Sequence, residues 1–413
     1  MHLKELTIAE FDAFSKTCPT TSYYQTSSYA LFMTENNYEY DLIGYVDELG
    51  VIKAAALILI KKLTLTTKYG YSPKGFLIDY FDYELLSSFT KAIKEYYSKK
   101  LVFIKINPEL AIGEINKYSK LTNYNQNISI RDFLLDLGYT KLKDNLYFEA
   151  LNPRFNAIIN TEEYSFDKLS KNTKNKIRKG NKKGLELEIA NRDGLDILFK
   201  FIKRKKPVNE FYYKSYYNVF AKNNSCDLFL IKINYEKYLI NSKNLYDKEL
   251  IKNNELANAL INNPTEININ KKMTSDKTLL SYKKDIEEAT IRLRDNKTTY
   301  IAAAFLIKYL NRVNIVISGI DPKYRSYNAN YFLHYKILEE YKKDYKFIDL
   351  NGLTGDFSNT NPYKGLNDFK LGFNPHVYEF IGEFDLILNE KAYKQLNKKG
   401  ILANTFNQKK KGN

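Results

Sequence analysis

The sequence is poor in the residues that build disulfide frameworks, metal sites and histidine-based active sites. Its 413 residues include two cysteines, three histidines and no tryptophan. Cys18 and Cys226 lie far apart in the chain, which excludes a disulfide framework or a zinc site and favours a reducing compartment. His2, His334 and His376 are too scattered for a metal site or a catalytic triad. We therefore expect a cytoplasmic protein that uses no metal, no cofactor and no histidine base.

Long apolar runs and the common catalytic motifs are absent as well. The longest apolar runs, 54–60 and 300–307, fall well short of the ~20 residues that span a bilayer. The N-terminus does not have the pattern of a signal peptide. There is no P-loop, no GxGxxG, no HExxH and no GxSxG. Any membrane contact should be peripheral, and the substrate should arrive already activated, needing positioning and charge stabilisation rather than a strong base.

Positive charge is what the sequence has in excess. It contains 64 Lys and Arg against 48 Asp and Glu, a formal net charge of +16. Two clusters contribute, one between 168 and 183 and one at 203–206 just before aromatic residues 211–213. Lysines neutralise phosphates and rings stack on bases, so this pattern favours a polyanion with exposed bases, with a solvated lysine-rich surface as the alternative. The first cluster includes Lys174, Lys176, Arg178, Lys179, Lys182 and Lys183, and the second includes Arg204 and Lys205.

Hydrophobic periodicity predicts two mixed α/β units. The predicted helices are 8–15, 84–99, 165–183, one from about 195, and 331–341. The predicted strands are 41–46, 54–61, 102–106, 185–189, 300–308, 313–319 and 347–350. Residues 235–298 differ, because Leu279, Ile286 and Leu293 repeat at coiled-coil spacing and Pro264 interrupts the pattern. We predict an antiparallel helical arm there, with two ordinary surface helices as the alternative.

A glycine-rich stretch after the last of these strands is a candidate binding loop. Residues 351–355 read NGLTG, and glycines let the backbone approach a ligand closely. Shortly after it, Lys370 stands between Phe369 and Phe373. Partial desolvation there would strengthen its field on a developing oxyanion, although such a lysine is more often a surface residue with a buried stem.

Eight short motifs follow one another in a characteristic order, with the arm in the expected place. Together they resemble the Fem-type (FemABX) aminoacyltransferases of peptidoglycan bridge synthesis, most of all the MurM/MurN branch. The likeness covers nearly the whole chain, and its specificity lies in the joint order of the motifs. The motifs are Gln25-Thr26 with Tyr29, PKGFLIDY (73–80), LSKNTK (169–174), KGLE (183–186), NEFYYK (209–214), NGLTG (351–355), FKLGF (369–373) and YEFIGEF (378–384).

The resemblance implies an α/β fold of two acetyltransferase-like (GNAT-type) domains with the coiled-coil arm inserted in the second. It places the first domain at 1–150, completed by 374–405, the second at 151–373, the arm at 235–298 and a basic tail at 406–413. It implies transfer of Ala, Ser or Gly from aminoacyl-tRNA to the stem-peptide amine of a muropeptide precursor such as lipid II. The basic surface and tail favour contact with the anionic inner leaflet, where lipid II resides, so we expect work at the cytoplasmic face of the membrane. A homologous partner protein is a further expectation.

Carried over by position, the resemblance assigns roles to single residues. Lys370 would stabilise the tetrahedral oxyanion and orient the tRNA 3′ end, and Phe369 would line that site. Asp79 would lie near the acceptor amine, with a structural carboxylate as the alternative. Tyr212 and Tyr213 would flank the muropeptide cleft unless they pack in the core. The implied activity also makes tRNA the expected polyanion for the lysine cluster 174–183. Tyr29 is a further candidate substrate contact.

Two departures from the family pattern concern phosphate binding. The family often places a lysine where this chain has Met33, and an arginine where it has Val208. Either Lys74, Arg204 or Lys205 replaces them, or the acceptor is held differently, as with a lipid-linked precursor. Two other functions stay open: an acetyl-coenzyme A transferase on the same fold, although its pyrophosphate-loop pattern is missing, and a non-catalytic RNA-binding adaptor.

Overall fold

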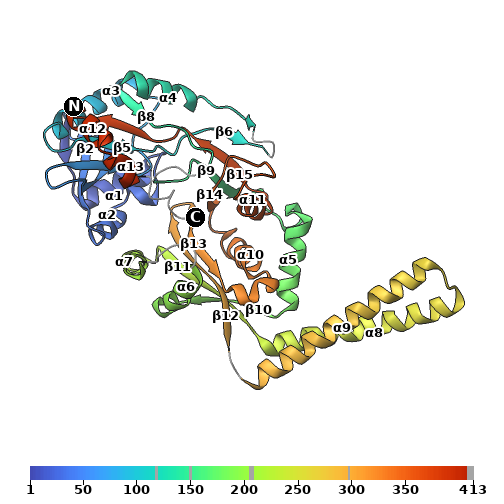
Figure 1. Cartoon of the computed structure of the whole chain (residues 1–413). Coiled ribbons are helices and arrows are strands. Elements are labelled where there is room, and N and C mark those ends of the chain that lie inside the picture. The colour runs from blue at the N-terminus through green and yellow to red at the C-terminus, as the bar shows by residue number, and fades with distance from the viewer. Residues whose placement is uncertain (117–119, 148–150, 204–208, 296–297, 407–413) are drawn as a thin grey trace.

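The computed structural model describes residues 1–116, 120–147, 151–203, 209–295 and 298–406. They form two sheets with covering helices, and a helical hairpin that projects from the second sheet's side of the molecule (Figure 1). This agrees with the predicted α/β class.

The first sheet has the strand order β1-β2-β3-β4-β5-β16-β8. Its neighbouring strands are antiparallel except β4 and β5, which are parallel and are connected through helix α3. The strands are β1 (His2–Glu5), β2 (Glu39–Val46), β3 (Ile52–Lys62), β4 (Lys68–Ser72), β5 (Phe103–Ile106), β8 (Tyr139–Lys141) and β16 (Phe384–Ile387). The helices of this unit are α1 (Ile8–Thr17), the 3-10 turn η1 (Tyr23–Gln25), α2 (Ser27–Thr34), α3 (Tyr83–Tyr97), α4 (Asn127–Asp136), α12 (Glu390–Lys398) and α13 (Ile401–Phe406).

The second sheet has the strand order β10-β11-β12-β13-β14-β9-β15-β6-β7 and, like the first, contains one parallel pair in an otherwise antiparallel sheet. Its one parallel pair, β13 and β14, is connected through helix α10. The strands are β6 (Ala111–Ile115), β7 (Leu121–Thr122), β9 (Phe155–Asn160), β10 (Leu185–Ala190), β11 (Cys226–Ile233), β12 (Thr299–Tyr309), β13 (Arg312–Ile320), β14 (Phe347–Leu353) and β15 (His376–Phe380). The helices are η2 (Phe166–Lys168), α5 (Lys171–Lys182), η3 (Arg192–Gly194), α6 (Leu195–Ile202), α7 (Glu210–Ala221), η4 (Pro322–Tyr327), α10 (Ala329–Tyr341) and α11 (Lys364–Leu371).

The two sheets exchange strands across the predicted domain boundaries. Strand β16 returns to the first sheet, where buried Lys105 of β5 pairs with buried Asp385 at 2.7 Å. Strand β15, in contrast, lies in the second sheet between β9 and β6, and β6 and β7 belong there too. The sheets are therefore interwoven, and the domain limits 1–150 and 151–373 stay a prediction.

A common core joins the two units. Phe32 of α2 stacks on Tyr216 of α7 with ring centroids 4.1 Å apart, and Tyr216 contacts Phe305 of β12 at 5.5 Å. One apolar cluster runs from α1, α2 and β3 to α6, α7 and β12. Burial of aromatic rings on both sides holds the units in one arrangement, and a site between them can be preformed.

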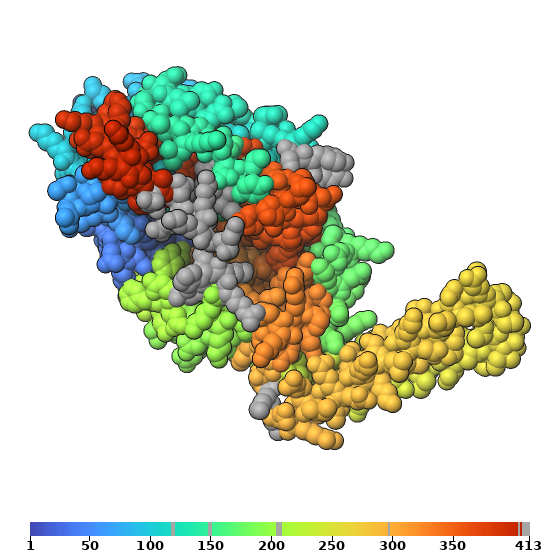
Figure 2. Space-filling model, viewed as in Figure 1, coloured from blue at the N-terminus to red at the C-terminus, as the bar shows by residue number. Residues whose placement is uncertain are grey.

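The predicted arm is a helical hairpin of α8 (Tyr235–Asn262) and α9 (Glu266–Arg294), turning at 263–265. It extends well beyond the body of the molecule (Figure 2). Its seam buries Ala289 and a polar contact in which Asn253 Nδ2 donates to Ser275 Oγ at 3.0 Å. At its base, Lys183 pairs with Asp285 at 2.8 Å. Among the helices of the described ranges, none is long and apolar enough to cross a membrane.

The predicted elements are confirmed, with shifted ends. The helix predicted over 165–183 starts later, because Ser170 caps α5 by accepting a hydrogen bond from Thr173 N at 3.2 Å. The strand predicted over 347–350 continues to Leu353 as β14, which carries an irregularity between Asp349 and Gly352.

Candidate active site

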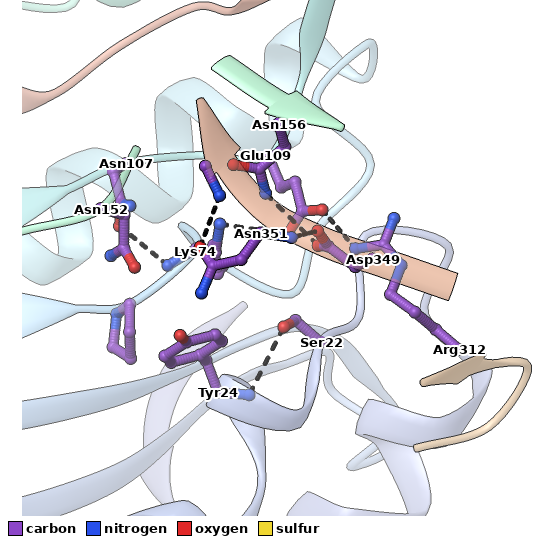
Figure 3. Close-up of polar contacts among 12 residues, drawn as sticks. Ser22, Tyr24, Lys74, Asn107, Glu109, Asn152, Asn156, Arg312, Asp349 and Asn351 are labelled. Carbon is purple, nitrogen blue, oxygen red and sulfur yellow. Dashed lines mark hydrogen bonds and ion pairs between the residues drawn. The ribbon is translucent and has the colours of Figure 1, made fainter. Parts of the chain in front are cut away.

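A polar pocket, here called the Lys74 pocket, lies between the two sheets (Figure 3). Lys74 and Glu109 come just after β4 and β5, at the carboxyl ends of the parallel pair, where ligands commonly bind in α/β sheets. The facing wall comes from β9, β13 and β14. The lining residues are Tyr23, Tyr24, Lys74, Glu109, Asn152, Pro153, Asn156, Asn314, Ile315, Val316, Asp349 and Asn351.

The loop that carries Lys74 has an unusual backbone. Lys74 and Gly75 both have positive φ, 62° and 85°. A Cβ on Gly75 would lie 2.4 Å from Tyr80 Oη and 3.0 Å from Pro108 Cα, so only glycine fits there. A buried lysine in the left-handed region is strained, and such strain persists where the surroundings impose it.

Gln25 is the residue that imposes this loop conformation. Its side chain is completely buried, and its Nε2 donates to Pro73 O at 2.8 Å and to Gly75 O at 2.9 Å. Its Oε1 accepts from Leu57 N at 2.9 Å. The Gln25-Thr26 and PKGFLIDY motifs therefore act together, the first clamping the second.

Glu109 joins the two walls of the pocket through ion pairs. Its carboxylate lies 3.4 Å from Lys74 Nζ and also pairs with Arg312 of β13. Burial alone would raise the pKa of Glu109, but the charges of Arg312 and Lys74 outweigh burial and lower it to about 2. Glu109 thus stays ionised and connects the units electrostatically.

Asp349 occupies the opposite wall in a different environment. Its Oδ1 accepts from Asn351 N at 2.7 Å, and its Oδ2 accepts from Asn156 Nδ2 at 3.3 Å. Burial raises the pKa of Asp349, with the charge of Arg312 opposing the shift. Asn351 has φ 69° and lies in the bulge where β14 leaves its register with β9. Bulges next to active sites commonly redirect side chains, and this one turns Asn351 toward the pocket.

Lys370 and Phe369 lie next to this bulge, on α11. Lys370 is 7% exposed, and its Nζ donates to the carbonyl of Gly352, the neighbour of Asn351. The ring of Phe369 contacts Tyr331 at 4.9 Å and His334 at 4.8 Å. The expected desolvation of Lys370 is therefore present, and β14 links this lysine to the Lys74 pocket.

The other predicted substrate residues are more dispersed. Asp79 is exposed outside the pocket, and its Oδ1 accepts from Phe81 N at 2.9 Å in the turn before α3. Tyr29 is buried behind Tyr24, with ring centroids 4.9 Å apart. Tyr212 packs on Phe32, and burial raises the pKa of Tyr213 to about 12. Tyr212 and Tyr213 of α7 both border the shared core. This position matches the alternative prediction, in which the two tyrosines pack in the core.

The predicted tRNA-binding residues lie along α5 and at its end. Arg178, Lys179 and Lys182 are exposed. Lys176 is partly covered, and its Nζ donates to Tyr331 Oη at 2.9 Å. Lys174 makes a local contact with the carbonyl of Asp167 at 3.0 Å, whereas Lys183 pairs with Asp285 of the arm. Arg204, Lys205 and Val208 lie outside the described residues, whereas Met33 is buried in α2.

Sequence reasoning missed most of the pocket. The missed residues come from distant parts of the sequence, and each is a common residue type. They are Glu109, Asn156, Arg312 and Asp349. A usable signal was present for Asp349, a carboxylate between Ile348 and Leu350 in a buried strand. Among the described residues no group of three His, Cys, Asp or Glu side chains is placed to hold a metal ion.

The arrangement suits recognition of a small charged substrate rather than strong-base chemistry. Two buried carboxylates with pKa values moved in opposite directions offer one permanent anion and one weaker anion. Lys370 of α11 adds a hydrogen-bond donor at Gly352 of β14, and the amides of Asn156 and Asn351 supply both donors and acceptors. Such a site can orient an ester and an amine and stabilise charge that develops between them.

Comparisons with known proteins agree with this picture. Aminoacyltransferase FemA of Staphylococcus aureus, strain bovine RF122 / ET3-1, is 24% identical over 413 aligned residues, which cover 95% of this chain and 97% of FemA. FemA of strain MW2 gives the same values. A crystal structure of FemX shares the fold with a TM-score of 0.74 at 19% identity, covering 96% of this chain and 100% of that chain. The FemAB family model matches residues 6–398, so this chain belongs to the FemAB family.

Proposed function

We propose that this protein takes Gly, Ala or Ser from aminoacyl-tRNA and joins it to the stem-peptide amine of a peptidoglycan precursor, with lipid II as the acceptor. Aminoacyl transfer in peptidoglycan bridge synthesis is the activity that its family and its FemA relatives support. The observation that carries the proposal is the position of buried Lys370 in a chain of this family. Its Nζ donates to the carbonyl of Gly352, and the preceding residue of that strand, Asn351, lines the Lys74 pocket.

The reaction exchanges an ester for an amide. The acceptor amine attacks the ester carbonyl, and a C–N bond forms as the carbonyl oxygen becomes an oxyanion. The C–O bond to the tRNA ribose then breaks, the carbonyl reforms, and the proton lost by the amine ends on the ribose oxygen, either directly or relayed through solvent. Lys370 stabilises the oxyanion in a dry site, where a fixed positive charge acts strongly. Phe369 lines the path of the tRNA 3′ end.

The α5 helix guides tRNA toward this centre. Lys176 contacts Tyr331, and Tyr331 contacts Phe369, so α5 and α11 are neighbours through α10 (Figure 1). Exposed Arg178, Lys179 and Lys182 neutralise the phosphates of the acceptor stem. Lys174 and Lys183 complete the basic edge.

The acceptor enters from the side of Lys74. Lys74, Tyr212, Tyr213 and Tyr29 border or support this side, and Arg204 and Lys205 take the place of the missing phosphate anchors. Asp79, outside the pocket, is assigned to the approach of the acceptor amine. A lipid-linked acceptor brings the basic protein to the cytoplasmic membrane face, where each Lys or Arg near an anionic surface contributes about 1 kcal/mol. A homologous partner protein at that surface is part of the same proposal.

The test is reconstitution with purified protein, lipid II and glycyl-, alanyl- or seryl-tRNA, followed by mass spectrometry of the muropeptide. We expect addition of one amino acid, and a loss of about 100-fold in turnover for Lys370→Met. Lys364→Met is the matched control, because Lys364 is partly exposed on the same helix and pairs only with Asp368 among the described residues. Equal rates for both variants would remove Lys370 from the mechanism.

The alternatives give distinct outcomes in the same assay. A non-catalytic adaptor binds tRNA but consumes no aminoacyl ester with any acceptor. An acetyltransferase binds coenzyme A and ignores tRNA. For the tRNA contact, Lys179→Glu should weaken binding and flatten its salt dependence, whereas Lys91→Glu on the exposed side of α3 should change neither.

A further inference from the structure

Within the described part of the chain, one buried polar atom of the Lys74 pocket has no hydrogen-bond partner. Asn156 is 4% exposed and lines the pocket, and its Nδ2 donates to Asp349 Oδ2 at 3.3 Å. Its Oδ1 has no hydrogen-bond partner among the described residues. A buried acceptor of this kind is costly unless a ligand supplies a donor, so the site is built for an N–H or O–H group.

The atoms beside Asn156 Oδ1 point to a cationic donor. Asp349 is 6% exposed and forms no ion pair among the described residues, because Arg312 and Lys74 both pair with Glu109 instead. Its hydrogen-bond donors in the described residues are the amide of Asn156 and the backbone N–H of Asn351. A carboxylate and an amide oxygen side by side offer two acceptors to one ammonium group.

We propose that Asp349 and Asn156 Oδ1 form a subsite for the α-ammonium group of the amino acid that is being transferred. This inference rests on the proposed function and adds the recognition of the donor's free amino group. Asp349 provides the countercharge and Asn156 fixes the direction of a second N–H bond. The subsite would thus separate aminoacyl donors from N-blocked or deaminated ones.

The donor's amine fits this subsite better than the acceptor's amine. A carboxylate in a dry pocket favours the charged form of any amine beside it. That would make an attacking amine less nucleophilic, because it must lose its proton to react. The α-ammonium of the donor takes no part in bond making, so holding it charged does not slow the reaction.

The experiment compares each aminoacyl-tRNA that the wild type uses with its α-hydroxy counterpart, made by replacing the α-ammonium with a hydroxyl. The kcat/KM ratio of the two donors is measured with lipid II for the wild type, Asp349→Asn and Asn156→Leu. We expect the wild type to prefer the aminoacyl donor by about 30-fold or more, because a charge-assisted hydrogen bond is lost with the analogue. Asp349→Asn should reduce that preference to about threefold or less, and Asn156→Leu should reduce it partly.

The control variant is Asp344→Asn, an exposed carboxylate shortly before the same strand, which should keep the wild-type ratio. The ratio is internal to each preparation, so a reduced folded fraction cancels. A wild type that uses both donors equally well would overturn the subsite, and so would an Asp349→Asn variant that slows both donors alike, since this would indicate a structural or proton-accepting role. A wild type without activity on any aminoacyl-tRNA would instead contradict the proposed function itself.

Discussion

The two walls of the Lys74 pocket hold their charges in different ways. On the wall after β4 and β5, Glu109 is matched by Lys74 and by Arg312, which reaches across from β13 (Figure 3). On the wall of β9 and β14, Asp349 is surrounded by amide groups. The first wall is neutralised and connects the two sheets, while the second keeps acceptors directed at the pocket.

This difference separates a structural carboxylate from a recognition carboxylate. The pKa of Glu109 is lowered to about 2, because Arg312 and Lys74 outweigh the cost of burial. The pKa of Asp349 is raised, because burial dominates there. A buried charge without a close ion-pair partner costs stability, and such a cost is commonly retained where a ligand provides the missing charge.

The largest expected effect comes from Glu109→Gln, which removes the shared anion of the first wall. It would leave Lys74 and Arg312 without their countercharge, and we expect unfolding to become easier by about 3–5 kcal/mol. Thermal and urea unfolding measure this. The control is Glu39→Gln, because Glu39 is 64% exposed in its pair with Lys68 and should contribute about 1 kcal/mol or less. A small effect for both would mean that the pairs across the pocket do not hold the sheets together.

The next effect concerns the backbone that presents Lys74. Gly75→Ala adds a Cβ at positive φ and 2.4 Å from Tyr80 Oη, and we expect a loss of about 2–4 kcal/mol together with a fall in kcat/KM. Gly50→Ala is the matched control, since Gly50 has φ 80° but nothing within 4 Å of an added Cβ. It should lose only about 1 kcal/mol and keep full activity. Equal losses would show that the crowding around Gly75 is relieved without cost.

The first wall was more accessible to sequence reasoning than the second. Gln25 and the PKGFLIDY loop are local motifs, and Lys74 was already a candidate because the usual phosphate anchors are absent. The structure adds the reason for the motifs, since Gln25 holds the loop at both Pro73 and Gly75. The arm and most strands were predicted because period and spacing are local properties.

The second wall depends on strand order, which local patterns do not encode. Asn156 and Asp349 meet because β9 and β14 are antiparallel neighbours, and Arg312 arrives through the parallel pairing of β13 with β14. The placement of β15 in the second sheet has the same origin, because the local pattern of a short strand does not state which sheet it joins. For Lys370, sequence indicated the flanking aromatic rings but not the carbonyl of Gly352 as a partner.

A smaller effect concerns folding stability, which should depend on pH in opposite directions for Glu109 and Asp349. Because the folded-state pKa of Glu109 is lowered, its contribution to stability is present above about 4.5 and is lost as pH falls toward 2. Because the pKa of Asp349 is raised, its contribution is present below about 3.8 and is lost as pH rises through the folded-state pKa. Asp349→Asn should therefore be at least as stable as the wild type at pH 7 and lose that advantage at pH 3.5. Melting temperatures across this range test it, and a variant that is less stable at neutral pH would contradict it.

The smallest effect is expected outside the pocket, at His376 on β15. Its Nδ1 lies 3.1 Å from Glu114 and its Nε2 lies 2.9 Å from Glu163. Burial opposes the charge, but the two carboxylates outweigh it and raise the pKa of His376 above 6.5. The stabilisation is therefore present below pH 6.5 and is lost as pH rises through the folded-state pKa. Since the pair is about one third exposed, His376→Gln should cost about 1 kcal/mol or less at pH 5.5 and nothing at pH 9. A penalty that is constant with pH would assign His376 a packing role, and one as large as that of Glu109→Gln would remove the distinction between a dry pocket and a solvated surface.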